Sequence, residues 1–480
     1  MFLSSSLITL ALALVAAAGP IPHVPHVHPV LPRGASVPGS GVHCAVKTAD
    51  GQFTLEGAVA HLNRTMNKYR QSLINLQNNG GTLDEGVIVM PMRPVAHTTS
   101  LTKRQSEALT DQEGGLEWTG VVSVGTPAQN FVIDFDTGSS DFWVPLTDCQ
   151  TCAGKTLFDP SKSSSLKALN GNFSISYGDG STASGLPFQD NALIRDKTIP
   201  VSLGGINVNN QIFAGAEVLT GNLVQTPGDG LMGLAFPAIS NLGVNNTLFD
   251  AFAQGQIPQP QFSFKLAETG SSLFIGGQDP SLFTGATEFH PLSSGMGFWQ
   301  IGNTTAKLGG VPAVSNFDAI IDSGTTLIVG PPQEVSTFYS QIPGAQLADP
   351  QSGFFTVPCS ANVPSLAFNW GGKDWTVDPS LFNLGPISQG SSQCALAIVG
   401  SDTGLGDNTW ILGDTFMQNV YSTFDFGQFA VGFSQLSQGG PASSSSSNSS
   451  STVGTGSTPP TTPAAAPCPC NCTGSASPAA

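Results

Sequence analysis

Short apolar runs separated by Gly, Asn, Asp and Pro dominate the chain between residues 116 and 437. The runs are rich in Val, Ile, Phe and Thr, a composition typical of β-strands bounded by turns. Long stretches with helical periodicity are scarce there, and the pattern predicts only brief helices, near residues 246–253 and 332–342. We therefore expect an all-β body.

The segments on either side of this body have other patterns. Residues 3–18 form an apolar run ending in three alanines, which is typical of a secretory signal peptide and is too short to span a membrane comfortably. No other stretch reaches the length of a membrane span. A Pro/His-rich stretch follows, and then apolar residues at helical spacing over residues 54–76. The dibasic pair Lys103-Arg104 predicts a processing site. Beyond residue 439 the Ser-, Thr- and Pro-rich composition predicts a disordered tail.

Charge is distributed unevenly along the 480 residues, whose formal net charge is −16. Residues 1–104 contain 8 Lys and Arg against 4 Asp and Glu, whereas residues 105–480 contain 8 against 28. A basic leader on an acidic body predicts that the two associate within the chain. The acidity of the body also argues against nucleic acid as a partner.

The eight cysteines fit an oxidising compartment. Two pairs are candidates for disulfides, Cys149 with Cys152 and Cys359 with Cys394. No second Cys or His pair stands near the first one, so we expect no metal site and no cofactor. We expect a monomer, although an odd number of tail cysteines suggests an intermolecular bridge. These are Cys468, Cys470 and Cys472.

One pattern occurs twice in the body. A β-branched and aromatic run ends at Asp136-Thr137-Gly138-Ser139, and 186 residues later a similar run ends at Asp322-Ser323-Gly324-Thr325. Each predicts a strand that delivers a carboxylate on a tight loop. A third triplet, Asp402-Thr403-Gly404, follows no apolar strand, and we expect only a solvated turn there.

Two such carboxylates at one interface would share a proton, because two like charges in contact cannot both ionise cheaply. The ionised member can deprotonate a bound water while the protonated member polarises a carbonyl of the substrate. This chemistry hydrolyses an amide without a metal or a covalent intermediate.

Taken together, the motifs resemble those of pepsin-type aspartic endopeptidases over nearly all of residues 105–438. The two Asp loops resemble the active-site loops, and residues 175–181 resemble the flap that closes over substrate. Residues 230–234 and 410–414 resemble the segments that pass behind each loop. Both cysteine pairs match disulfides of the family.

The resemblance implies an all-β, bilobed pepsin-like fold, with two related six-stranded-barrel-type lobes and the active-site cleft between them. The expected parts are a signal peptide (1–18), a prosegment (19–104), two lobes (105–278 and 279–438) and the tail (439–480). The implied protein is a secreted fungal endopeptidase, made as a prepro-zymogen, that acts on proteins and peptides at acidic pH.

The resemblance also implies roles for residues that match the family motifs. Asp136 and Asp322 would be catalytic. Ser139 and Thr325 would bind the outer carboxylate oxygens, Thr137 and Ser323 would brace the two loops, and Gly138 and Gly324 would let main chain approach them. Substrate would contact the flap and the cleft wall, at Tyr177, Gly178, Asp179, Trp143 and Thr326. Tyr177 would pack near Trp143, for which the alternative is plain core packing.

Specificity and inhibition follow from the same resemblance. Asp134 shares the strand face of Asp136, and with Asp179 it would let Lys bind where bulky apolar residues are otherwise preferred; the alternative is that both only add surface acidity. In pepsinogen-like relatives a prosegment Lys followed by Tyr blocks the catalytic pair, and Lys68-Tyr69 is the candidate here; the alternative is that Lys68 only lies on the surface of a helix. Sequons predict glycosylation at six positions, namely Asn63, Asn172, Asn245, Asn303, Asn448 and Asn471.

Three other functions fit the sequence less well. A catalytically inactive pepsin-like binding or inhibitor protein would usually lack part of the catalytic pair or flap, yet Asp136, Asp322 and Tyr177 are all present. A glycosidase also uses two carboxylates, but not on duplicated Asp-hydroxyl-Gly loops. A Ser-His-Asp hydrolase is disfavoured because His290 is the only histidine of the body.

Overall fold

The computed structural model describes residues 53–90, 110–112, 117–176, 181–194, 206–224, 226–267, 270–350 and 352–437. Several predicted features lie outside these ranges: the signal peptide, Lys103 and Arg104, the flap residues Tyr177, Gly178 and Asp179, and the tail with its cysteines, Asn448 and Asn471. Within the described ranges no helix is long and apolar enough to cross a membrane.

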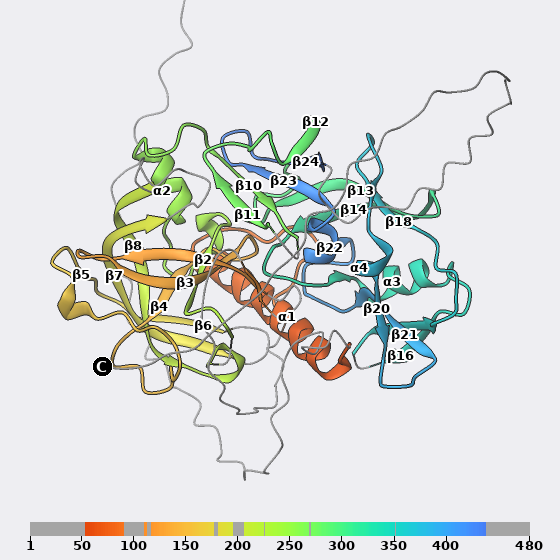
Figure 1. Ribbon diagram of the computed structural model, residues 1–480, viewed down its shortest axis with the longest axis horizontal. Coiled ribbons are helices and arrows are strands. Elements are labelled where there is room, and N and C mark those ends of the chain that lie inside the picture. The colour runs from red at the N-terminus through yellow and green to blue at the C-terminus, as the bar shows by residue number, and fades with distance from the viewer. Residues whose placement is uncertain are drawn as a thin grey trace, which may run out of the picture.

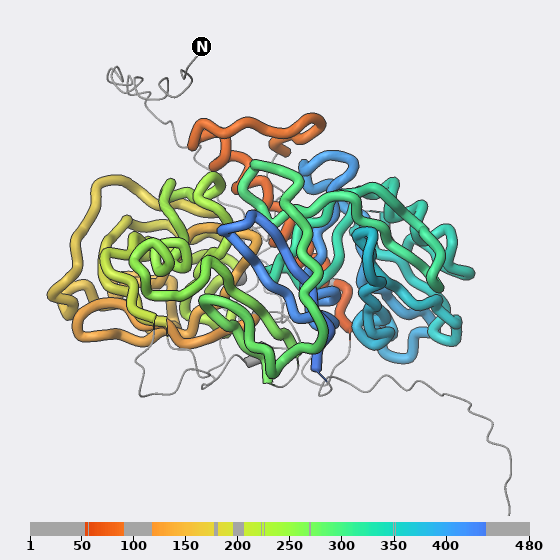
Figure 2. Tube along the Cα trace, turned by 90° about the horizontal axis from the view of Figure 1, so that it is seen from above, coloured from red at the N-terminus to blue at the C-terminus, as the bar shows by residue number. Residues whose placement is uncertain are grey.

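Helix α1 (Leu55–Asn78) lies between two β-rich halves of the body (Figure 1). Figure 2 shows the same segment passing between the halves in a view from above. The expected helix over residues 54–76 is therefore confirmed. Its apolar side chains at helical spacing are buried, among them Leu62, Met66, Leu73 and Leu76.

The first half is built on a nine-stranded sheet in the order β1-β2-β3-β9-β4-β8-β7-β5, with β6 on β7. An additional β2–β7 pairing folds the sheet back on itself, as in a barrel. Its strands are β1 (Thr110–Gln112), β2 (Glu117–Val124), β3 (Gln129–Asp136), β4 (Phe142–Pro145), β5 (Lys167–Ala168), β6 (Phe173–Ser176), β7 (Thr182–Ile194), β8 (Ile206–Leu219) and β9 (Gly230–Gly233). The helical segments of this half are η1 (Pro160–Lys162), η3 (Gly221–Val224), η4 (Pro237–Ile239) and α2 (Thr247–Ala253).

The second half is built on a ten-stranded sheet in the order β16-β17-β21-β15-β22-β14-β13-β18-β19, with β20 on β21. Its strands are β13 (Gln300–Leu308), β14 (Val311–Ile321), β15 (Ile328–Gly330), β16 (Gln346–Asp349), β17 (Phe354–Pro358), β18 (Leu366–Asn369), β19 (Trp375–Thr376), β20 (Asn383–Pro386), β21 (Gln393–Gly400) and β22 (Thr409–Leu412). The helices are α3 (Pro332–Tyr339), α4 (Pro379–Phe382) and α5 (Asp414–Met417). Both brief helices expected in the body, near 246–253 and 332–342, are thus present as α2 and α3.

A five-stranded sheet in the order β11-β10-β23-β24-β12 joins the two halves. Strands β10 and β11 precede the expected lobe boundary at residues 278 and 279, and the other three strands follow it. The sheet therefore combines strands from both expected lobes. The strands are β10 (Gln261–Lys265), β11 (Ser272–Ile275), β12 (Phe283–Pro291), β23 (Val420–Asp425) and β24 (Ala430–Leu436).

The two halves repeat one local arrangement. Strand β3 runs parallel to β9 with Asp136 opposite Gly233, and β14 runs parallel to β22 with Ile321 opposite Leu412. In each half a further short strand, β4 or β15, pairs antiparallel with that same partner. The mostly β, two-part architecture confirms the expected pepsin-like fold class.

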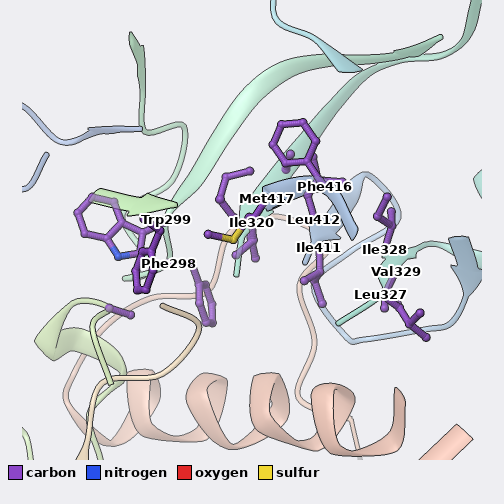
Figure 3. Packing of buried hydrophobic residues seen from close by; sticks show 14 of the residues in the cluster. Phe298, Trp299, Ile320, Leu327, Ile328, Val329, Ile411, Leu412, Phe416 and Met417 are labelled. Atoms are coloured by element: carbon purple, nitrogen blue, oxygen red, sulfur yellow. The ribbon is translucent and has the colours of Figure 1, made fainter. Parts of the chain in front are cut away.

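An apolar core supports the strand that leads into the second loop. Figure 3 shows part of it, including Trp299, Ile320, Leu412 and Phe416, above helix α1. These four side chains have no exposed surface. Burying a large apolar side chain contributes about 1.5–3 kcal/mol to stability, so the loop that follows rests on a firmly packed base.

Candidate active site

Both predicted carboxylates lie at strand ends, deep between the two halves. Asp136 is the last residue of β3, and Asp322 directly follows β14. Asp136 is 1% exposed and Asp322 is 0% exposed. Because each strand becomes buried toward its end, at Phe135 in β3 and at residues 319–321 in β14, the chain carries each carboxylate into the interior at the point where it must turn.

Matching hydrogen bonds hold each carboxylate in its own loop. The Gly138 N–H donates to Asp136 Oδ1 at 2.8 Å, and Ser139 Oγ donates to Asp136 Oδ2 at 2.6 Å. In the other half the Gly324 N–H donates to Asp322 Oδ1 at 3.0 Å, and Thr325 Oγ1 donates to Asp322 Oδ2 at 2.5 Å. The expected carboxylate contacts of Ser139 and Thr325 are thus present.

Hydroxyl groups brace the two loops across the interface. Thr137 Oγ1 accepts from the Ser323 N–H at 2.9 Å and donates to the Ile321 carbonyl at 2.9 Å. Ser323 Oγ accepts from the Thr137 N–H at 3.1 Å and donates to the Phe135 carbonyl at 2.7 Å. This reciprocal pattern fixes the position of each loop relative to the other.

The glycines of the two loops allow this close approach. A Cβ atom added to Gly138 would collide with the carboxylate of Asp322, and one added to Gly324 would collide with that of Asp136. Any side chain at either position would therefore push the loops apart.

Helix α1 places a lysine between the two carboxylates. Lys68 Nζ lies 3.0 Å from Asp136 Oδ1, and 2.9 Å and 2.8 Å from the two oxygens of Asp322. The Tyr69 hydroxyl donates to Asp322 Oδ2 at 3.0 Å. The structure thus brings Lys68 and Tyr69, the two residues singled out in the sequence, directly onto the carboxylate pair.

Burial and the ion pairs act in opposite directions on these groups. Burial raises the pKa of Asp136, against the opposing effect of Lys68. Burial also acts to raise the pKa of Asp322, but Lys68 and the local hydrogen bonds outweigh it and leave this pKa lowered. Burial disfavours the charged form of Lys68, yet the two carboxylates outweigh that effect and raise its pKa. The buried lysine therefore stays charged between the two carboxylates.

Two further side chains of helix α1 reach the second loop, and sequence reasoning did not single them out. The backbone N–H of Thr326 donates to His61 Nε2 at 2.9 Å, and Thr65 Oγ1 lies 3.3 Å from Thr325 Oγ1. His61 and Thr65 precede Lys68 by seven and three positions, which places all three on one helix face. This spacing from Lys68 could have predicted that both side chains face the carboxylate loops.

The third Asp-Thr-Gly triplet lies away from the carboxylate pair, but it is not the solvated turn that the sequence predicted. Asp402 is exposed, whereas Thr403 and Gly404 are buried. The Ile88 N–H donates to the Gly404 carbonyl at 2.9 Å, so the segment after helix α1 covers this turn. The polar sequence around it could not reveal a covering segment that lies more than 300 residues earlier.

The other predicted residues include two on the strands near Asp136, four cysteines and four sequon asparagines. Asp134 is half-buried on β3, and Trp143 is buried on β4. Both expected disulfides are present, Cys149–Cys152 and Cys359–Cys394. Of the four described sequon asparagines, Asn63 is half-buried on helix α1 and three are exposed, namely Asn172, Asn245 and Asn303.

Comparison with known proteins agrees with this geometry. The family model for eukaryotic aspartyl proteases matches residues 117–436. An aspartic protease of Phaffia rhodozyma is 39% identical over 338 residues, which cover 69% of this chain and 79% of the relative. Rhizopuspepsin of Rhizopus chinensis is 32% identical over 384 residues, covering 78% of this chain and 88% of the relative. Pepsin A of Bos taurus is 34% identical over 333 residues, covering 67% and 84%. The chain therefore belongs to the eukaryotic aspartyl protease family, as its motifs predicted, and is an aspartic-type endopeptidase.

Proposed function

We propose that this protein is a secreted endopeptidase that cuts peptide bonds at acidic pH, with Asp136 and Asp322 as the catalytic pair. The observation that carries the proposal is that both carboxylates contact one ammonium group, Lys68 Nζ, at 3.0 Å or less. Two carboxylates held this close share one proton once the lysine leaves.

The shared proton gives the pair both functions that hydrolysis needs. The ionised carboxylate takes a proton from a water held between the two groups, and the protonated carboxyl donates a hydrogen bond to the substrate carbonyl. Water adds to the carbonyl carbon, and a proton then passes to the leaving nitrogen as the C–N bond breaks. This division of roles is well known for the family. Because titration belongs to the pair, neither Asp has a fixed role.

Protein digestion tests this function directly. The processed protein is expected to digest a denatured protein substrate at pH 3–5, and a statine-type mimic of the tetrahedral intermediate is expected to abolish the digestion. Digestion that is insensitive to the mimic, or none at all in a correctly folded preparation, would contradict the proposal. The same assay with matched Phe and Lys peptides measures the preference for bulky apolar residues and the expected acceptance of Lys.

We also propose that the prosegment holds the enzyme inactive until the pH falls, with His61 as one sensor. Burial, together with the charges of Arg64 and Lys68, lowers the pKa of His61 to about 3 from 6.5, while Asp322 acts in the opposite direction. Above pH 6.5 the histidine is neutral in both the docked and the released prosegment. Between pH 6.5 and 3 only the released form takes up the proton, so docking weakens about tenfold per pH unit.

Replacing His61 with Gln tests this sensor, since an amide oxygen still accepts from the Thr326 N–H but does not titrate. For each protein, the release rate of the prosegment at pH 4.5 is divided by its rate near pH 7. This ratio is expected to be about 100-fold smaller for His61→Gln than for the wild type. The measurement is the pH dependence of conversion of the full chain, followed by gel and by peptide cleavage. His290→Gln, in the body, serves as the control and should keep the wild-type slope. An unchanged slope in His61→Gln would remove the histidine from the mechanism.

A further inference from the structure

The turn around η4 presents a row of backbone carbonyls to the prosegment. Asn75 Nδ2 donates to the Ile239 carbonyl at 3.0 Å. Asn79 Nδ2 lies 3.0 Å from the Ala238 carbonyl and 2.8 Å from the Ser240 carbonyl, with the Pro237 carbonyl at 3.5 Å. Three consecutive carbonyl oxygens are thus bound by amide N–H donors of the prosegment.

A buried carboxylate and the hydrogen bonds within the turn together explain why these carbonyls face outward. Asp141, which is 1% exposed, accepts from Ser240 Oγ at 2.8 Å, from the Asn241 N–H at 2.8 Å and from the Leu242 N–H at 2.9 Å. In a trans peptide the N–H and the adjoining C=O point in opposite directions. Because the Asn241 N–H points inward to Asp141, the Ser240 carbonyl must point away from it. The N–H groups of Ile239 and Ser240 are likewise used inside the turn, by the Phe236 and Pro237 carbonyls.

We propose that, once the prosegment has left, this carbonyl turn is an accessory subsite for a substrate side chain that donates hydrogen bonds, above all Arg or Lys. The inference rests on the proposed endopeptidase function. Carbonyl oxygens only accept, and Lys and Arg carry three and five N–H donors with no acceptor, whereas an Asn amide offers two. Carbonyls also keep this character at acidic pH, so the subsite works under the conditions proposed for catalysis.

Helix geometry places the subsite relative to the cut bond. Asn75 and Asn79 follow Lys68 by seven and eleven positions, about 10–16 Å along a helix that rises 1.5 Å per residue. An extended substrate advances about 3.3 Å per residue. A donor side chain would therefore reach the carbonyl turn from roughly the third to the fifth residue on one side of the cut bond.

Peptides cleaved by the processed enzyme test the subsite. A parent peptide with a fixed cut site would carry norleucine, citrulline or Arg at the third, fourth or fifth position on either side. We expect Arg to raise kcat/KM about tenfold over norleucine at one of these positions, with citrulline, a neutral donor, between the two. Equal turnover at every position overturns the subsite, and so does an equal Arg preference at all positions, which reports only the acidity of the body. Failure to cleave even the parent peptide counts against the endopeptidase function instead.

The full-length protein provides a second test that does not depend on substrate choice. Asn79 is exposed, so its replacement should not disturb folding. We expect Asn79→Lys to slow acid-induced release of the prosegment about tenfold, Asn79→Leu to accelerate it, and Asn79→Asp to accelerate it most, because an anion is repelled by carbonyl oxygens. Gln77→Lys adds the same charge at an exposed position on the same helix and serves as the control. If Asn79→Lys behaves like Gln77→Lys, the carbonyl turn has no preference for a cation.

Discussion

Replacing Asp322 with Asn is expected to lower peptide cleavage by about 10³-fold or more, and Asp136→Asn is expected to do the same. The amide keeps the size and the hydrogen-bonded position of the carboxylate, but it neither accepts the proton of water nor carries the shared proton. Each variant thus removes the coupled acid–base function while leaving the loops intact. The measurement is kcat/KM on one fluorogenic peptide across pH 3–6. An inactive variant cannot convert itself, so all proteins should be processed by a separate protease that cuts after Lys103-Arg104.

The third Asp-Thr-Gly triplet supplies a matched control. In Asp402→Asn the amide oxygen can still accept from the Gly404 N–H, which binds Asp402 Oδ1 at 3.0 Å. We expect its cleavage rate to stay within about twofold of the wild type, because surface substitutions rarely affect a distant site. The assignment of the pair would be wrong if Asp322→Asn kept more than a tenth of the wild-type activity. It would also be wrong if Asp402→Asn lost as much activity as Asp322→Asn.

Replacing Lys68 with Met is expected to open the inhibited form at neutral pH. Removing one partner of a buried ion pair costs about 3–5 kcal/mol, because the remaining charges stay buried without compensation. Here two carboxylates would lose their shared cation, so we expect the fraction of open molecules to rise about 100-fold or more. The measurement is binding of a statine-type inhibitor to the full chain at pH 6.5 by calorimetry, a readout that needs no turnover.

Two companion variants make this result specific. Tyr69→Phe loses one hydrogen bond to Asp322 and should open the cleft by a smaller factor, about tenfold. Lys307 forms an ion pair with Asp374 in the second half of the body, with 2.6 Å between Nζ and Oδ1. Lys307→Met removes this lysine and should leave inhibitor binding as weak as in the wild type. If Lys68→Met folds normally, judged by its circular dichroism, and still excludes the inhibitor, the lysine is not the blocking group.

Much of the site could be predicted because its signals are local. Each carboxylate loop is a strand end followed by a hydroxyl residue and a glycine within four positions, so residue type and spacing specify it. The paired cysteines and the helical spacing that predicts α1 are signals of the same kind. The resemblance to the family predicted Lys68 and Tyr69 as the blocking residues, and in the structure both contact the carboxylate pair.

The features that sequence reasoning missed join segments far apart in the chain. His61 meets Thr326 across 265 positions, and Asn79 meets Ser240 across 161. No spacing rule connects such residues, since their contact depends on how a helix lies between two sheets. The same reason explains why the Asp402 turn was interpreted as solvated: its cover, the residues around Ile88, comes from another part of the chain.

Local sequence patterns were therefore enough to predict the two carboxylates on repeated loops, their supporting hydroxyls and glycines, and an all-β scaffold. These depend on strand periodicity and turn composition, which act over a few residues. Long-range packing was needed to show how helix α1 covers the two carboxylates, that His61 is buried against the second loop and that the carbonyls around η4 are covered. Burial and desolvation arise when distant surfaces meet, and they set the pKa of His61 and the charge of Lys68 in the docked state.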